Sequence, residues 1–160
     1  MSCGLEPVDD AEDVLRRVPQ AWYPNERGEP QPRIDTFLPT SADLTGLSLS
    51  RAKYRSIESA ARGSDPSKVY HVASLQVSKV RSARLDGVSQ ALEVTADPQP
   101  GDDGHAQIPL LYRRDYDSDP VKKTRIKEWA RKLASSVAVM ALVSPPAATI
   151  LPTESEHPQP

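Results

Sequence analysis

Residues 69–77 read VYHVASLQV, the strongest secondary-structure signal in the chain. Apolar side chains occupy every second position except the one held by His71. This alternation predicts a β-strand with one face against a hydrophobic core. A neutral imidazole on that face is tolerated when both ring nitrogens have partners. The apolar positions are Val69, Ala73, Leu75 and Val77.

Shorter patterns on both sides of this strand predict the other elements of a domain. Alternating apolar and polar residues over 46–50, 92–96 and 105–112 are typical of strands. Residues 51–62 have apolar side chains at helical spacing, and a second, short helix is predicted for residues 78–85. A turn is predicted at Ser64-Asp65-Pro66, because these residue types favour turns.

The longest predicted helix begins at Asp119-Pro120 and extends to about residue 142. Aspartate caps a helix N-terminus, and proline suits the first helical position. The apolar residues within this range fall on one side of a helix and are expected to face the core. They are Ile126, Trp129, Ala130, Leu133, Val137 and Met140.

Together these elements predict an α+β fold, with a small mixed sheet of about four strands, helices packed on one side and a long C-terminal helix. Prolines concentrate at both ends of the chain, where they disfavour regular structure. We therefore expect an irregular proline-rich arm over residues 1–35 and a single α+β domain over residues 36–142. Residues 143–160 are expected to form a disordered tail.

Composition limits the classes of protein that this chain can belong to. Its 160 residues carry a formal net charge of −2, which predicts neither strong nucleic-acid affinity nor membrane binding by the whole molecule. Cys3 is the only cysteine, so an internal disulfide and a cysteine-based zinc site are excluded. The apolar run Val137–Val143 is too short to span a bilayer. Without a secretory signal, the protein is expected to be cytoplasmic.

Histidine and aspartate residues provide the first weak candidates for a catalytic site. Asp103 and His105 lie in one predicted loop, where they suggest either an acid–base pair or a simple turn. A metal site is not expected, because one short segment supplies too few convergent ligands. A sharper hypothesis pairs His105 with His71 across adjacent strands, whereas the simpler one makes His71 a satisfied core histidine. No cofactor motif is present.

A serine and arginine pattern suggests a second enzymatic hypothesis. Ser48 and Arg51 lie in one short segment, and two arginines precede them at Arg16 and Arg17. Enzymes that transfer ADP-ribose often combine an arginine on an early strand, a serine-containing strand and a later glutamate. Glu93 is the only glutamate in a later predicted strand, so this likeness is limited.

The predicted C-terminal helix is rich in basic residues and suggests contact with phosphates. These residues flank both sides of the apolar stripe, a position in which long basic side chains often cover the margins of a packed helix. No aromatic or glycine-rich binding motif accompanies them, so a solvated face is favoured over nucleic-acid binding. The candidates are Lys122, Lys123, Arg125 and Lys127.

Several short strings occur over roughly residues 34–110: Thr36-Phe37-Leu38-Pro39, Asp43, Gly46-Leu47-Ser48-Leu49, Asp97-Pro98 and Gly104-His105-Ala106-x-Ile108. In these strings the chain resembles a group of small uncharacterised bacterial proteins. The resemblance implies a bacterial, cytoplasmic protein and brings no activity with it.

Three functional hypotheses follow, of which a non-enzymatic interaction module or accessory subunit with a protein partner is favoured. The first alternative is a small enzyme acting on a nucleotide or nucleic acid, by ADP-ribosyl transfer or hydrolysis. The second is a nucleic-acid binder that uses the helix over residues 120–142. A pocket that joins Ser48, His71 and His105 would favour the enzyme, whereas a flat apolar patch would favour the module.

Overall fold

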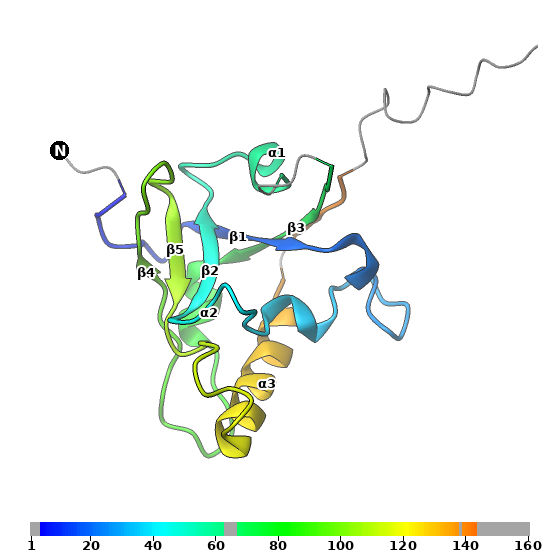
Figure 1. Ribbon diagram of the computed structural model, residues 1–160, viewed down its shortest axis with the longest axis vertical. Helices are drawn as coiled ribbons and strands as arrows, with labels where there is room; N and C mark the ends of the chain where they lie inside the picture. The colour runs from blue at the N-terminus through cyan, green and yellow to red at the C-terminus, as the bar shows by residue number, and fades with distance from the viewer. Residues whose placement is uncertain (1–3, 63–66, 138, 144–160) are drawn as a thin grey trace, which may run out of the picture.

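A computed structural model describes residues 4–62, 67–137 and 139–143 of the chain. Its centre is a six-stranded sheet in the order β4-β5-β2-β1-β3-β6, and every neighbouring pair is antiparallel (Figure 1). The strands are β1 (Asp13–Val18), β2 (Leu47–Arg51), β3 (His71–Gln76), β4 (Thr95–Ala96), β5 (His105–Ile108) and β6 (Val139–Ala141).

The α+β class agrees with this mixture of helix and strand, but the prediction of a mixed sheet of about four strands was wrong. A mixed sheet was expected because helices were predicted between strands, as in parallel crossovers. The helices α1 (Ile57–Ala60) and α2 (Val77–Ser82) are only four and six residues long, α3 (Pro120–Ala134) precedes an antiparallel strand, and each neighbouring pair of strands is antiparallel. Two strands, β1 and β6, lie where the sequence predicts none.

Strand β1 runs through the segment predicted as an irregular arm over residues 1–35. It lies inside the sheet, where all six of its residues pair with β3. Val14 and Val18 point into the main core, while Arg16 and Arg17 interrupt the apolar pattern that would have revealed the strand. Nearby prolines therefore do not prevent regular structure here, because none lies within the strand itself.

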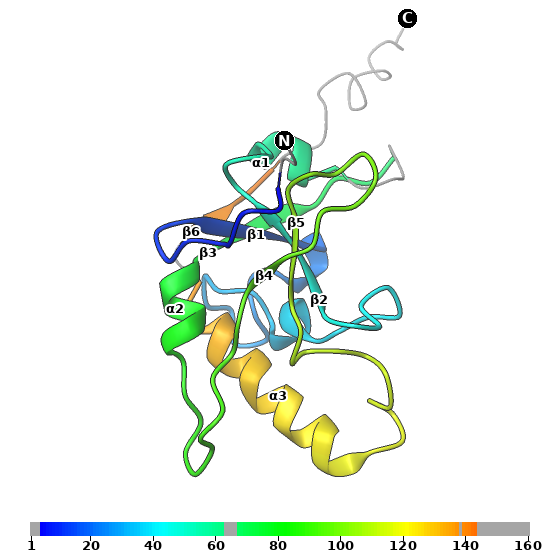
Figure 2. The same ribbon diagram turned by 90° about the vertical axis from the view of Figure 1, so that its left-hand side faces the viewer.

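Helices occupy both faces of the sheet, which corrects the prediction that they pack on one side. α2 and α3 lie on one face and the short α1 lies on the other (Figure 2). Two 3₁₀ helices, η1 and η2, connect β1 to β2, and η2 packs against α3. The bounds are η1 (Gln20–Trp22), η2 (Ile34–Phe37), α1 (Ile57–Ala60), α2 (Val77–Ser82) and α3 (Pro120–Ala134).

The predicted start of α3 is confirmed, whereas its predicted end was wrong. The Asp119 side chain accepts a hydrogen bond from the Lys122 backbone N–H at 3.2 Å, and Pro120 is the first helical residue. The helix ends at Ala134, and the hydroxyls of Ser135 and Ser136 donate to the carbonyl of Lys132. Residues 139–141 then form β6 along the open edge of β3. Beyond Val143, the predicted tail lies outside the described residues.

The predicted helix over residues 51–62 is reduced to the four residues of α1. Ser56 caps it, accepting from the Ser59 backbone N–H at 3.1 Å. Arg51, at the start of the predicted helix, belongs to β2 instead and is fully buried. The turn predicted at residues 64–66 lies outside the described part of the chain.

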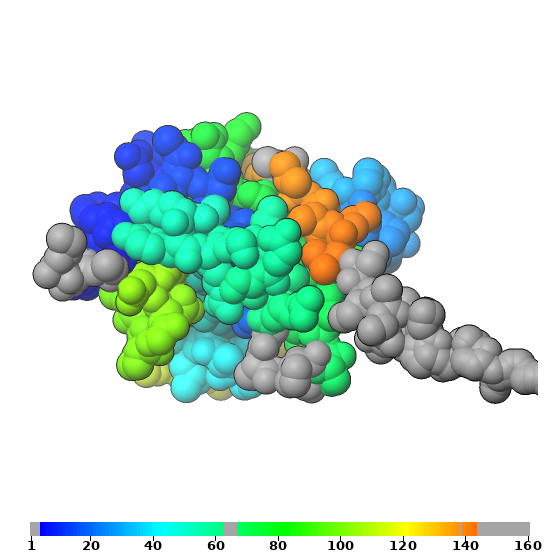
Figure 3. Space-filling view, turned by 90° about the horizontal axis from the view of Figure 1, so that it is seen from above, coloured from blue at the N-terminus to red at the C-terminus, as the bar shows by residue number. Residues whose placement is uncertain are grey.

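Two hydrophobic clusters hold the sheet between its helices. The larger one fills the face covered by α2 and α3, where Trp129 is 2% exposed and Leu75 is fully buried. The smaller one lies under α1 and consists of Leu15, Ala60, Ala61 and Val72. Figure 3 looks onto this second face and shows the segment that contains α1 crossing it. α1 covers only part of the face, so the strands beside it remain accessible.

None of the helices in the described residues is long and apolar enough to cross a membrane.

Candidate functional site

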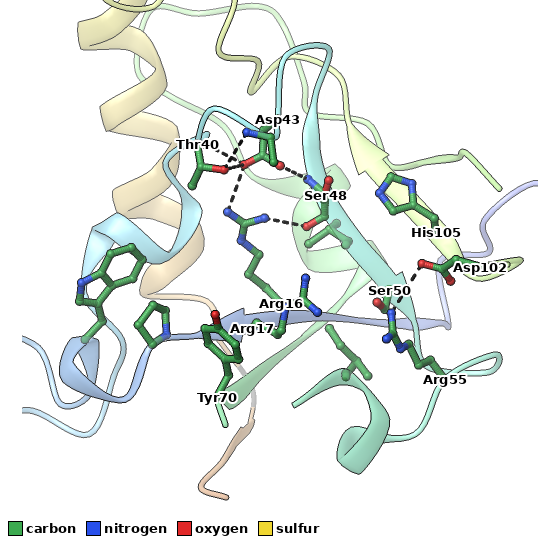
Figure 4. Close-up of a pocket in the computed structure, with 16 residues that line it drawn as sticks. Arg16, Arg17, Thr40, Asp43, Ser48, Ser50, Arg55, Tyr70, Asp102 and His105 are labelled. Carbon is green, nitrogen blue, oxygen red and sulfur yellow. Dashed lines mark hydrogen bonds and ion pairs between the residues drawn. The ribbon is translucent and has the colours of Figure 1, made fainter. Parts of the chain in front are cut away.

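The accessible part of the α1 face carries polar side chains from β2 and β5. Ser50 pairs with His105 across these strands, and Ser48 pairs with Gln107, so the four side chains share one face. Leu49 and Ala106, which alternate with them, point into the main core. A cavity of about 380 Å³ opens over this face (Figure 4). Its volume is within the range of small-molecule sites, about 300–1,000 Å³.

A local separation of β1 from β2 forms the deep part of the cavity. The two strands pair only at Val14 and Leu15, and the Arg16 side chain enters the gap that follows. Its Nε donates to the carbonyl of Thr36 and its Nη1 to that of Ser48, both at 2.9 Å. Arg16 thereby connects β1 to η2 and to β2 where the two strands no longer pair.

Asp43 completes the charge balance around Arg16. The two side chains are 12% and 2% exposed and approach to 3.3 Å. Burial acts to raise the pKa of the Asp43 carboxyl, but Arg16 and the backbone N–H groups of Thr40 and Ser48 outweigh it and hold the pKa below its ordinary value. A guanidinium has five N–H donors, of which these contacts use three. The other two N–H donors of Arg16 take no part in these contacts.

Arg17 brings a second positive charge to the wall of the cavity. Its Nη1 donates to the carbonyl of Arg62 at 3.2 Å, and its guanidinium lies 5.7 Å from the ring centroid of Tyr70. Within the described part of the chain, no carboxylate forms an ion pair with Arg17. The Arg17 side chain is exposed and belongs to the lining of the cavity.

The opposite end of the cavity is formed by Arg55, Asp102 and His105. Arg55 lies 3.5 Å from Asp102, and the two side chains are 28% and 30% exposed. His105 Nδ1 lies 2.9 Å from the carbonyl oxygen of Asp97 and 3.1 Å from its carboxylate. These contacts orient the ring, so His105 offers a ligand only Nε2. That nitrogen can donate or accept a single hydrogen bond.

A third group of side chains gives the cavity an apolar end. Pro19, Trp22 and Tyr70 line it there, beside Arg17. Figure 4 shows Tyr70 on the side of Arg17 that faces away from Asp102 and His105. Trp22 is half-buried and also packs against the main core, which holds its ring in place. The cavity thus combines an aromatic end with a polar end.

Among the candidates predicted from sequence, the structure places Ser48 and His105 in the same cavity. Asp103 is exposed and lies outside it, whereas its neighbour Asp102 is a lining residue. The loop reverses direction here, so adjacent residues point to different sides. The acid–base pair suggested for Asp103 and His105 is therefore not present at this cavity.

Arg51, another predicted site residue, has a structural position instead. It is fully buried, and its Nε and Nη2 contact the Glu12 carboxylate at 2.9 and 2.7 Å. It also donates to the carbonyls of Gly4, Glu6 and Pro7. Because successive strand residues point to opposite faces, Arg51 projects away from Ser50 and holds the N-terminal segment.

The alternative that pairs His71 with His105 across adjacent strands does not hold in the structure. Their strands β3 and β5 are separated by β1 and β2, and the two rings lie on opposite faces of the sheet. His71 Nδ1 accepts from the Val143 backbone N–H at 3.1 Å, and the ring packs edge-on against Tyr23. Burial lowers the pKa of His71. These contacts give one ring nitrogen of the half-buried His71 a hydrogen-bond partner.

The arrangement expected for ADP-ribosyl transfer also differs from the structure. Glu93 is not a lining residue of the cavity. Its carboxylate instead accepts from Arg81 and from the backbone N–H of Val94. Without a carboxylate from that position, Ser48 and the arginines lack the third group on which that hypothesis depends.

The basic residues of α3 mostly have partners within the fold. Lys122 Nζ lies 4.2 Å from the ring centroid of Tyr112, and Arg125 lies 3.6 Å from Glu128. Lys123 lies 5.3 Å from the ring centroid of Tyr116. Lys127 is exposed and points away from the apolar stripe. Three of the four candidate residues therefore contact side chains in the described part of the fold, and only Arg125 does so through an ion pair.

Sequence reasoning missed several of the residues that shape the cavity. The sequence places Trp22 in an irregular arm, identifies Arg17 only as preceding the Ser48–Arg51 segment, and gives no reason to bring Arg55 and Asp102 together. Nothing in the sequence indicates that these four residues meet, because Arg17 and Trp22 lie far along the chain from Arg55, and Arg55 lies far from Asp102. The one available signal was the pair of arginines within the short apolar segment 14–18.

Within the described residues, no group of three or more histidine, cysteine, aspartate or glutamate side chains is placed to hold a metal ion. Comparison with protein-family models, with curated proteins and with solved structures yields no match.

Proposed function

We propose that this protein is a binding module whose cavity takes a small phosphorylated ligand. The observation that carries the proposal is the position of Arg17, a cation on the cavity wall with no carboxylate partner in the described part of the chain. Arg16 and Arg55 add two further guanidinium groups, and Asp43 and Asp102 oppose them. The charged side chains of the lining therefore have one positive charge in excess.

The chemistry of the lining favours phosphate over other anions. Guanidinium groups bind phosphate oxygens through several N–H donors at once. The hydroxyls of Ser48 and Ser50 lie on the floor between the arginines and add neutral donors. A carboxylate would use fewer of these groups, since it has two oxygens rather than three.

A non-enzymatic role accords with the separation of the candidate catalytic residues. Ser48 and His105 share the cavity, but Arg51, His71 and Glu93 lie elsewhere. We propose that ligand binding regulates an accessory function with a protein partner. The resemblance to small bacterial proteins supports a bacterial cytoplasmic setting for that partner.

Titration calorimetry with pyrophosphate tests the phosphate site. The parent protein is expected to bind, and Arg17→Gln is expected to weaken binding roughly tenfold to hundredfold, the range for losing a charged hydrogen bond of about 1.5–3 kcal/mol. Lys127→Gln removes the same charge from an exposed position outside the cavity and should leave the affinity unchanged. Equal losses in both variants, or no binding by the parent, would contradict the proposal.

A further inference from the structure

The cavity has two chemically different ends, and this division suggests what kind of phosphorylated molecule it takes. The floor is formed along β1 and its continuation, from Leu15 beside Ser50 to Pro19 beside Trp22. Four residues of extended chain, at about 3.3 Å each, separate the two ends by about 13 Å. A lone phosphate would occupy only the part of the cavity near the arginines.

The end near Pro19 presents flat apolar surfaces. Trp22 and Tyr70 both line it, although the chain is poor in aromatic residues at 5%. The Arg17 guanidinium lies over the Tyr70 ring and extends the flat surface with a cationic plane. Tryptophan, tyrosine and arginine planes are the groups on which nucleic-acid bases stack.

We infer that the ligand is a nucleotide, with its base against Trp22 and its phosphate between Arg17 and Arg55. This inference rests on the proposed phosphate site and names the molecule that fills the rest of the cavity. The Ser48 and Ser50 hydroxyls remain donors to the phosphate, and the sugar spans the distance from the phosphate to the base. His105 Nε2 is left facing the phosphate end as a single hydrogen-bonding group.

The two tryptophans of the chain provide a direct optical test. Trp129 is 2% exposed in the main core, whereas Trp22 lines the cavity, so a ligand in the cavity reaches only Trp22. Adenosine 5′-monophosphate is expected to quench Trp22 fluorescence and to bind roughly 5- to 150-fold more tightly than ribose 5-phosphate, the range for one base–aromatic stack. Ribose 5-phosphate should bind with little quenching.

Substitutions of Trp22 and Tyr70 distinguish a loss of base stacking from a loss of the folded structure. Trp22→Phe keeps a stacking surface, so it should retain the affinity for adenosine monophosphate and lose the quenching. Trp22→Leu should reduce that affinity to the level of ribose 5-phosphate without changing ribose 5-phosphate binding, which reports an intact cavity. Tyr70→Leu repeats the comparison without altering the fluorophore.

The possible outcomes distinguish the inference of a nucleotide ligand from the proposal of a phosphate site, on which it rests. Equal affinity for adenosine monophosphate, ribose 5-phosphate and pyrophosphate would overturn the nucleotide and leave the phosphate site standing. Absence of binding by all three would overturn both. Chromatography of the nucleotide after incubation should recover it intact. Conversion to another product, abolished by His105→Gln, would confirm a nucleotide ligand and overturn the non-enzymatic module.

Discussion

Replacing Arg51 by methionine tests how the N-terminal segment is attached to the sheet. Arg51→Met leaves the Glu12 carboxylate, 9% exposed, without the guanidinium that contacts both of its oxygens. Removing one partner of a buried ion pair costs about 3–5 kcal/mol. Glu12 keeps a bond from the Asp9 backbone N–H and lies 3.9 Å from Lys53, so the lower end of the range, about 3 kcal/mol, is expected.

Urea denaturation measures this loss, and a thermal midpoint lower by about 6–12 °C should accompany it in a chain of this size. Arg114→Met is the matched control, because Arg114 is exposed, and its stability should stay within about 0.5 kcal/mol of the parent. Adding Glu12→Leu to Arg51→Met should recover part of the loss by removing the unpaired carboxylate. A midpoint for Arg51→Met equal to that of Arg114→Met would refute this reasoning.

Two further predictions concern the core and the response to acid. Trp129→Ala should cost about 3–5 kcal/mol in urea unfolding because it empties the centre of the main core, while Lys127→Ala on the exposed side of α3 should cost less than about 0.5 kcal/mol. Unchanged stability in Trp129→Ala would instead make this stripe a binding face. Arg51 holds the pKa of Glu12 below its ordinary value, and despite its burial the Asp43 carboxyl also has a lowered pKa. Lowered carboxyl pKa values stabilise the fold above about pH 4, and this contribution disappears as pH falls further. The urea midpoint, measured between pH 6 and about pH 2.5, should therefore decrease once the pH is lower than about 4. The decrease should be smaller in Asp43→Asn, which lacks the carboxyl. An equal dependence of the midpoint on pH in the parent and in Asp43→Asn would contradict the role given to Asp43.

Local sequence signals predicted the elements whose patterns are uninterrupted. The alternation around residues 71–76 corresponds to β3, and the Asp119-Pro120 pair marks the start of α3. These signals depend on neighbouring residues only, so one sequence is enough to read them. β6 was missed because residues 139–141 are apolar at a spacing compatible with a helix. Their strand conformation depends on the open edge of β3, which no local pattern reports.

The cavity could be predicted only in part, because local sequence patterns do not report contacts between distant segments. Ser48 and His105 were singled out from their local context, and strand register brings them together. Arg16 and Asp43 meet only because β1 separates from β2 after Leu15, a tertiary feature. Because β2 includes both Ser50 and Arg51, the alternation of side chains along a strand puts Arg51 on the face opposite Ser50. The prediction of a helix that begins at residue 51 therefore did not reveal that Ser50 and Arg51 lie on opposite faces.

Nuclear magnetic resonance tests the central claim most directly, because it locates the ligand on the protein. In a titration of the full chain with adenosine 5′-monophosphate, the account predicts saturable shifts of the backbone amides of Arg17, Ser48 and His105 and of the Trp22 indole N–H. The same shifts should be reduced in Arg17→Gln at equal ligand concentration. Shifts confined to residues 120–132 of α3, with those cavity resonances unmoved, would contradict the account.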